Sequence, residues 1–246
     1  MSQVKIWRRL DYWLKNAPVV PMTDDWKALH ISDPHIEDGD KADDFKKNYP
    51  LFMNTIREYL ARQYKICIEG DWQDRWKQPD EIKILSAYPD LFELVESERK
   101  KGNIFQIRGN HDDVLPYKQA VKFVHQGTGK TILCVHGHQG DWCNDQDSWI
   151  GKSFVRYIWA PSQRLLGLPD PTTATPDNPK KHNLTRDAFH KWANQERKID
   201  LELVWGHTHV YGDVGRSHNC GSWVGPGGEG VIVEQGGLQI KAERFL

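Results

Sequence analysis

The sequence lacks the marks of several protein classes. No apolar run approaches the roughly 18–20 residues that a helix needs to cross a bilayer, and the N-terminal segment has no apolar core of a secretory signal. Charge of one sign is not in excess either. The 33 Lys and Arg against 34 Asp and Glu give a formal net charge of −1, whereas nucleic-acid binders usually carry a basic excess. We therefore expect a cytoplasmic protein with no clear nucleic-acid partner.

Cysteine is scarce, and its spacing excludes two further classes. The four cysteines form no Cys-x-x-Cys pair, which argues against a zinc ribbon or a thioredoxin-like motif. Cys67 and Cys134 lie in apolar, strand-like runs, so we expect buried free thiols, which are typical of a reducing compartment. The chain also contains no internal repeat and no low-complexity tract.

The order of apolar segments predicts a single α/β domain over residues 1–246, a length that suffices for one large core. Helices are expected at about 3–16, from about residue 49 onward and at about 80–100. Strand-like runs alternate with the helices, and late hairpins indicate that the sheets are mixed. The predicted strands are 27–32, 64–68, 103–107, 121–125, 131–135, 201–205 and a hairpin within 230–245.

Two segments are rich in aromatic residues. The N-terminal helix places Ile6, Leu10 and Trp13 on one side and basic residues elsewhere. It could therefore lie on a membrane surface as a peripheral contact, or it could cover the core. The proline-containing stretch 142–198 breaks the strand–helix rhythm and is predicted to be an insertion or cap. Its aromatic residues, such as Trp149 and Phe154, either line an apolar pocket or cover the domain.

Five short polar motifs follow five of the predicted strands. They are Asp33-Pro-His35, Gly70-Asp71, Gly109-Asn-His-Asp112, His136-Gly-His138 and Gly206-His-Thr-His209. Ligands of open α/β sheets bind beyond the carboxyl ends of the strands, so all five motifs could converge on one site. Their Asp, His and Asn side chains are mixed nitrogen and oxygen donors, which suit Mn, Fe, Zn or Ni. Two such ions about 3.5–4 Å apart can clamp the attacking and leaving oxygens of a phosphoester.

This ordered set resembles the calcineurin-like metallophosphoesterases, whose pattern is DxH, GD, GNHD, a histidine followed by Gly, and GHxH. The resemblance implies two mixed β-sheets packed as a sandwich and flanked by helices, with two divalent ions, expected to be Mn²⁺. The implied metal ligands are Asp33, His35 and His209 for one ion, Asn110, His136 and His207 for the other, and Asp71 bridging both. His111 would be the general acid, Asp112 would orient it by hydrogen bonding, and a hydroxide between the ions would be the nucleophile.

Two nearby residues have open roles. His138 is a candidate for contact with the substrate or for support of its neighbours. Asp74, three residues after Asp71, either orients a ligand or is solvated or caps a helix.

The expected substrate is a small molecule with a phosphodiester, pyrophosphate or phosphomonoester bond. In overall appearance the chain resembles the UDP-2,3-diacylglucosamine hydrolases, through the insertion and the element Asn219-Cys-Gly-Ser-Trp223. It departs from them at His111, where they have arginine, and at His138, where they have aspartate. A nuclease of the superfamily and a catalytically silent binding scaffold are the alternatives.

Overall fold

The computed structural model describes residues 2–140, 153, 155–166, 183–225 and 227–246. The α-helices are α1 (Gln3–Asn16), α2 (Tyr49–Ala61), α3 (Glu81–Ala87), α4 (Pro89–Lys100), α7 (Ala160–Leu166) and α8 (Asn183–Ala193). Shorter helical turns are η1 (Asp44–Lys47), η2 (His138–Gly140), the π-helix η3 (Val155–Trp159) and η4 (Gln235–Gly237).

The strands form two sheets, each of which mixes parallel and antiparallel pairs. One has the order β1-β5-β6-β7-β9-β8 and the other β11-β10-β2-β3-β4. The strands are β1 (Val19–Met22), β2 (Ala28–Ile31), β3 (Lys65–Glu69), β4 (Ile104–Ile107), β5 (Ala120–His125), β6 (Thr131–Val135), β7 (Leu201–Trp205), β8 (Gly212–Val214), β9 (Ser217–Asn219), β10 (Gly228–Glu234) and β11 (Gln239–Phe245). The predicted α/β fold with two mixed sheets flanked by helices is confirmed.

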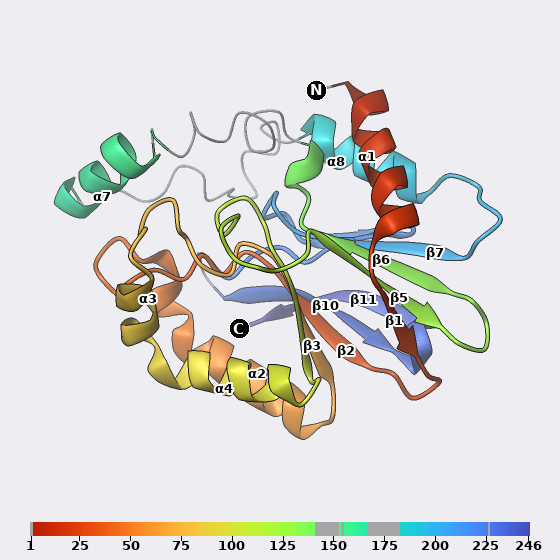
Figure 1. The fold of residues 1–246 in the computed structure, drawn as a ribbon, viewed down its shortest axis with the longest axis horizontal. Coiled ribbons are helices and arrows are strands. Elements are labelled where there is room, and N and C mark those ends of the chain that lie inside the picture. Colours follow the sequence, from red (N-terminus) through yellow and green to blue (C-terminus); the bar gives the residue numbers. More distant parts are fainter. Residues whose placement is uncertain (1, 141–152, 154, 167–182, 226) are drawn as a thin grey trace.

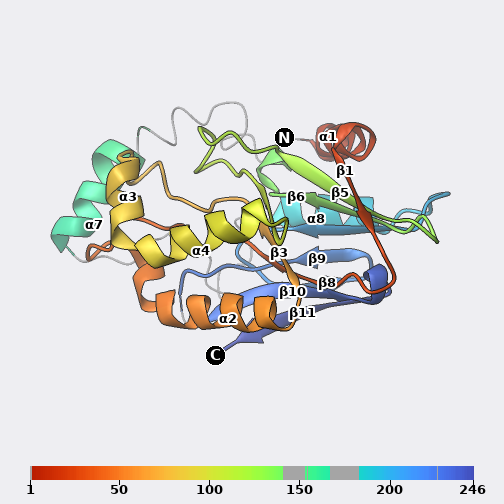
Figure 2. The same ribbon diagram turned by 60° about the horizontal axis from the view of Figure 1, so that its bottom comes forward.

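The sheets stack as the two inner layers of the molecule (Figures 1 and 2). Helices α2 and α4 cover the outer face of the β2-containing sheet, and α1 and α8 cover the outer face of the other. Three buried apolar clusters fill the spaces between these four layers. The carboxyl ends of β2, β3, β6 and β7 are thereby held at one edge of a rigid sandwich.

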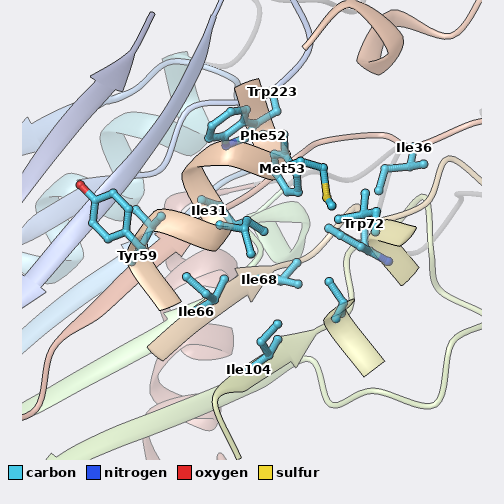
Figure 3. Packing of buried hydrophobic residues seen from close by; sticks show 14 of the residues in the cluster. Ile31, Ile36, Phe52, Met53, Tyr59, Ile66, Ile68, Trp72, Ile104 and Trp223 are labelled. Carbon is cyan, nitrogen blue, oxygen red and sulfur yellow. The ribbon is translucent and has the colours of Figure 1, made fainter. Parts of the chain in front are cut away.

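The cluster beneath α2 follows directly from the sequence pattern. Strands β2 and β3 are buried in nearly every position because both of their faces are covered, as is usual for parallel strands inside a sandwich. Ile31, Ile66 and Ile68 pack against Phe52 of α2 (Figure 3). Burial of each such side chain contributes about 1.5–3 kcal/mol, which fixes the strands that precede the polar motifs.

The apolar side of α1 faces the protein. Ile6 and Leu10 are fully buried with Phe189 and Trp192 of α8 in one cluster, and the indole N–H of Trp7 donates to the carbonyl of Ala188. This burial favours the second sequence hypothesis, in which the helix covers the core, and peripheral membrane contact stays a prediction. In the described part of the chain, no helix is both long and apolar enough to span a membrane.

The structure differs from the local predictions at one helix and at the strands β1, β8 and β9, which were not predicted. The helix expected over 80–100 is two helices, because Pro89 lacks a backbone N–H and disfavours the helical conformation in the residue before it. Tyr88 accordingly has φ −136° and ψ 56°. The sequence analysis also missed β1, which includes Pro21 and lies at the edge of its sheet, where a missing N–H costs no ladder hydrogen bond.

About half of the predicted insertion, including Trp149 and Phe154, lies outside the described residues. Its boundaries at 142–198 and the single-domain division of the chain stay predictions.

Candidate metal centre

The motifs come together because their strands are neighbours. Strands β2, β3 and β4 are adjacent and parallel, and they end just before Asp33, Asp71 and Asn110. Strands β6 and β7 are adjacent and parallel in the other sheet, and they end just before His136 and His207. The carboxyl ends of both sheets meet at one edge, so all seven predicted ligands lie in one region.

Five of the predicted ligands have positive φ angles, which residues with a Cβ rarely adopt. They are Asp33 (55°), His35 (48°), Asp71 (49°), His207 (68°) and His209 (56°). Such a conformation costs about 1–2 kcal/mol per residue, so the surrounding structure must impose it. Strain concentrated in this way is characteristic of functional sites.

Two glycines allow the strand ends to approach one another. A Cβ on Gly109 would collide with the carboxylate and backbone of Asp71, and one on Gly70 would lie 2.6 Å from His136 Nδ1. Gly70 also has a φ of 97°. Any side chain at these positions would displace Asp71 or His136.

The first ligand group surrounds one oxygen of Asp33. Asp33 Oδ1 lies 3.2 Å from His209 Nε2 and 3.5 Å from His35 Nε2. Its other oxygen, Oδ2, accepts hydrogen bonds from the backbone N–H of His207 and the hydroxyl of Ser32. The carboxylate is therefore fixed by one oxygen and presents the other to the two imidazoles.

The second group surrounds Asp71. Its Oδ2 lies 3.1 Å from His136 Nε2 and also 3.6 Å from His35 Nε2, which belongs to the first group. Its Oδ1 accepts a hydrogen bond from the backbone N–H of His111. Ligand atoms of Asp71, His136 and His207 all lie within 4.8 Å of one another, as do those of Asp33, His35 and His209.

Unsatisfied buried atoms test whether these residues fit metal ions. His35 Nε2, His136 Nε2 and Asn110 Oδ1 are buried without a hydrogen bond to any described residue. The other ring nitrogens are occupied, since His35 Nδ1 contacts Asp74 at 3.3 Å and His136 Nδ1 donates to the carbonyl of Glu69 at 2.8 Å. Metal-binding histidines are typically anchored in this way through the nitrogen that does not bind the ion. The residues therefore fit a pair of divalent ions.

The electrostatics of the site favour cations. Burial disfavours the charged form of Asp33, but His136 and His209 beside it hold the pKa of this carboxyl well below its usual range. Burial likewise disfavours a charged His136, yet Asp71 and Asp33 raise its pKa to about 9. Ionised carboxylates thus attract protons to the imidazoles, and a bound ion would compete with those protons.

His111 is held by a residue other than the predicted one. His111 Nδ1 lies 3.0 Å from Asp74 Oδ1, and the ring stacks on Trp76 with 4.2 Å between the centroids and 18° between the planes. Asp74 Oδ2 contacts His35 Nδ1, so one carboxylate touches both the predicted acid and a predicted ligand. Burial opposes ionisation of Asp74, but His111 and His35 hold its pKa well below the usual range.

The predicted orienting role of Asp112 is corrected by these contacts. Its carboxylate accepts hydrogen bonds from the backbone N–H groups of Trp72 and Gly109, at 2.9 and 2.6 Å. It therefore ties the loop after β4 to the loop after β3. Burial and the charge of Asp71 raise the pKa of Asp112 to about 7. The residue is adjacent to His111 in sequence, but its side chain is turned toward the backbone.

His138 lies beside the second ligand group. Its side chain is buried, its ring centroid is 5.5 Å from that of His136, and Nδ1 has no hydrogen bond to a described residue. Burial and the neighbouring His136 and His207 hold the pKa of His138 well below its usual range. A role in substrate binding stays a prediction.

The sequence matches the profile of the calcineurin-like phosphoesterases over residues 27–211. The chain belongs to this family. A search of curated proteins gave no match. Among solved structures, the chain is similar to a conserved uncharacterized protein, a predicted phosphoesterase, from Streptococcus pneumoniae. The two sequences are 14% identical, the match covers 89% of this chain and 97% of that chain, and the TM-score is 0.36. It is also similar to a single mutant of Vps29 from Entamoeba histolytica, with 16% identity, coverage of 89% and 99%, and a TM-score of 0.36.

In this calcineurin-like phosphoesterase, sequence reasoning left Asp74 undecided and missed Trp76. The position of Asp74, three residues after Asp71, was the signal that could have assigned Asp74 to the site. Nothing in the sequence pairs Trp76 with His111, because the two residues lie on loops that follow different strands.

Proposed function

We propose that this calcineurin-like phosphoesterase hydrolyses a phosphodiester, a pyrophosphate or a phosphomonoester with two divalent ions, for which Mn²⁺ is the expected choice. The observation that carries the proposal is the place of Asp71 Oδ2, 3.1 Å from His136 Nε2 and 3.6 Å from His35 Nε2. One oxygen thus faces both ligand groups, as it does in a carboxylate that bridges two ions through a single oxygen.

The chain supplies nitrogen and oxygen donors to both ions. Asp33, His35 and His209 would hold one of them, and Asn110, His136 and His207 would hold the other. Bound there, the ions would provide Lewis acidity and a water of lowered pKa as nucleophile. The positive φ angles and the buried anchors of the ligands would keep these donors in place without reorganisation.

His111 is proposed to protonate the leaving oxygen. Asp74 occupies its Nδ1, so Nε2 is the atom that can carry a transferable proton. The His111 side chain is 15% exposed, whereas that of His136 is fully buried, so His111 can reach a substrate. Asp74 and the stacked Trp76 hold the ring in one orientation, which is how positioned acids gain their efficiency.

The narrower resemblance to UDP-2,3-diacylglucosamine hydrolases rests partly on residues 219–223, and these have structural roles here. The amide of Asn219 donates to the hydroxyl of Thr208 and the carbonyl of Gly206, and so supports the loop between His207 and His209. Trp223 is buried and packs edge-on against Phe52.

One contact does favour an amphipathic substrate. Arg156 of η3 donates to the carbonyl of Arg75, next to Asp74, and Tyr157 and Ile158 on the same turn are exposed. An apolar group held there would lie next to the loop that carries Asp74 and Trp76. We therefore keep an acylated nucleotide sugar as a candidate substrate.

A substrate panel tests the proposal. The purified protein is stripped with a chelator and assayed with and without Mn²⁺ on a phosphomonoester, an aryl diester, a nucleotide-sugar diphosphate, an acylated nucleotide sugar and single-stranded DNA. Chelation should abolish hydrolysis and Mn²⁺ should restore it. Full activity of demonstrably metal-free protein would refute the proposal. Inactivity of Mn²⁺-loaded protein on every substrate would favour a silent binding scaffold.

A further inference from the structure

A second group of metal-binding side chains lies in the core between the two sheets, beneath the candidate metal centre. His30 comes from β2, Cys67 and Glu69 from β3, and Cys134 from the facing strand β6. All four residues are at most 1% exposed. His30 and Cys67 are register partners, and Glu69, two residues after Cys67, points to the same side of the sheet.

The spacing of these atoms suits a small ion. Ligand atoms of His30, Cys67 and Glu69 all lie within 4.8 Å of one another, and Cys134 Sγ lies 3.7 Å from His30 Nδ1. Ligands about 2.0–2.3 Å from a tetrahedral zinc ion are roughly 3.3–3.8 Å apart. The closer contact of 2.7 Å between His30 Nδ1 and Glu69 Oε1 is a hydrogen bond, which would open by about 0.6 Å on binding.

Hydrogen bonds alone leave this group unsatisfied. Glu69 Oε2 is buried and has no hydrogen-bond partner in the described part of the chain. A buried carboxylate oxygen without a partner is costly, and charges in protein interiors are normally paired or bound to metals. The second oxygen of the Glu69 carboxylate is therefore left for a ligand that the hydrogen bond from His30, at 2.7 Å, does not supply.

We propose that His30, Cys67, Glu69 and Cys134 form a closed structural site for a zinc ion, separate from the ions of the catalytic centre. Both cysteines would bind as thiolates, so the ion would offset two of the three negative charges of Cys67, Cys134 and Glu69 and leave one, spread over the whole site. Cys134 lies beside His30 Nδ1, in the place of a fourth donor. Thiolate and imidazole donors select zinc over the harder ions.

Binding has a definite proton balance. The thiol protons of Cys67 and Cys134 leave to solvent, and the ring proton of His30 moves from Nδ1 to Nε2. Without the ion, burial and the charge of Glu69 raise the pKa of the Cys67 and Cys134 thiols, and a cation reverses this effect. Because the site is closed, the ion is taken up during folding.

The site would stabilise the base of the catalytic centre. Glu69 is the last residue of β3, directly before Gly70 and Asp71. Its backbone carbonyl also accepts the hydrogen bonds of His136 Nδ1 and the Ser32 hydroxyl, at 2.8 and 3.2 Å. An ion bound to the Glu69 side chain would fix this carbonyl and the turn that follows it.

Cobalt substitution tests the site without relying on activity. The full chain is produced with Co²⁺ in place of zinc, with Cys143, which lies outside the described residues, replaced by alanine. We expect a near-ultraviolet thiolate-to-cobalt charge-transfer band, which the nitrogen and oxygen ligands of the catalytic centre cannot give. Cys67→Ala should lose the band together with one metal ion per chain, and Cys134→Ala should weaken it.

Two matched variants serve as controls. Cys220→Ala removes another buried thiol of the same core cluster and should keep the band. Asp71→Asn should lose the metal of the catalytic centre and still show the charge-transfer band. Absence of the band from cobalt-loaded parent protein, or its persistence in Cys67→Ala, would overturn the site. Hydrolysis by the cobalt protein without the band would overturn this site alone, and a band without hydrolysis would count only against the proposed function.

Discussion

Replacing Asp74 by asparagine tests which carboxylate holds the proposed general acid. The substitution would keep the shape of the side chain but remove the charge that faces His111 Nδ1 at 3.0 Å. A hydrogen bond to a charged group contributes about 1.5–3 kcal/mol. If that contribution is needed in the transition state, its loss slows the reaction about 10- to 150-fold.

The loss should depend on the leaving group. An alkyl or phenyl phosphodiester needs a proton on its leaving oxygen, so Asp74→Asn should show the full decrease in kcat. A nitrophenolate leaves without a proton, so the same variant should be slowed much less. The assay compares kcat for both esters in Mn²⁺, with metal content measured in parallel because Asp74 also contacts His35.

Asp112→Asn is the matched control. Its carboxylate is also buried, but it accepts from the backbone of Trp72 and Gly109. This variant should lose stability and slow both esters equally. If the loss of activity depends on the leaving group in Asp112→Asn and not in Asp74→Asn, the proposal that Asp74 holds His111 in place is refuted.

Substitutions at the bridging ligand, the glycine beside it, the N-terminal helix and a buried histidine test the remaining contacts. Asp71→Asn should lose both metal content and activity, and elemental analysis that finds normal metal would contradict a bridging role. Gly109→Ala should reduce metal affinity without changing the leaving-group dependence, since a Cβ there collides with Asp71; calorimetric titration with Mn²⁺ measures this. Ile6→Ala and Leu10→Ala should each lower the free energy of unfolding by about 2–5 kcal/mol and leave vesicle binding unchanged, whereas a loss of vesicle binding without destabilisation would support the predicted membrane contact. His218→Gln should destabilise the fold in a pH-dependent way. Burial opposes protonation of His218, but Asp213 and Glu202 raise its pKa above 6.5. Its contribution is therefore complete below pH 6.5 and lost as the pH rises through the raised value. The pKa values of Glu202 and Asp213 are lowered from 4.5 and 3.8, so their contribution is lost only in stronger acid. Melting temperatures of parent and variant should differ most near about pH 6 and converge at high pH, and a constant difference would argue against the ion pairs.

The sequence by itself determined the class of fold and the candidate ligands. The motifs from Asp33 to His209 each follow an apolar run, and both the runs and the motifs can be recognised from neighbouring residues alone. The apolar run indicates a buried strand, and the residue types of the motif indicate the donor atoms. Parallel strands that share an edge bring together the motifs of one sheet, so convergence within each sheet could be predicted from the sequence, whereas the meeting of the two sheets at this edge depends on how they stack.

Only the tertiary structure decided which side chains pair. His111 is adjacent to Asp112 in sequence, yet its partner is Asp74, 37 residues away, because the backbone N–H groups of Trp72 and Gly109 already occupy the Asp112 carboxylate. The apolar side of α1 carries no information about whether lipid or α8 covers it, since both bury it equally well. The contact between Cys134 and His30 spans 104 residues and depends on how the two sheets are stacked. Residue types and spacing specify which side-chain donors each strand carries, whereas the packing of the sheets specifies which side chains of other elements they contact.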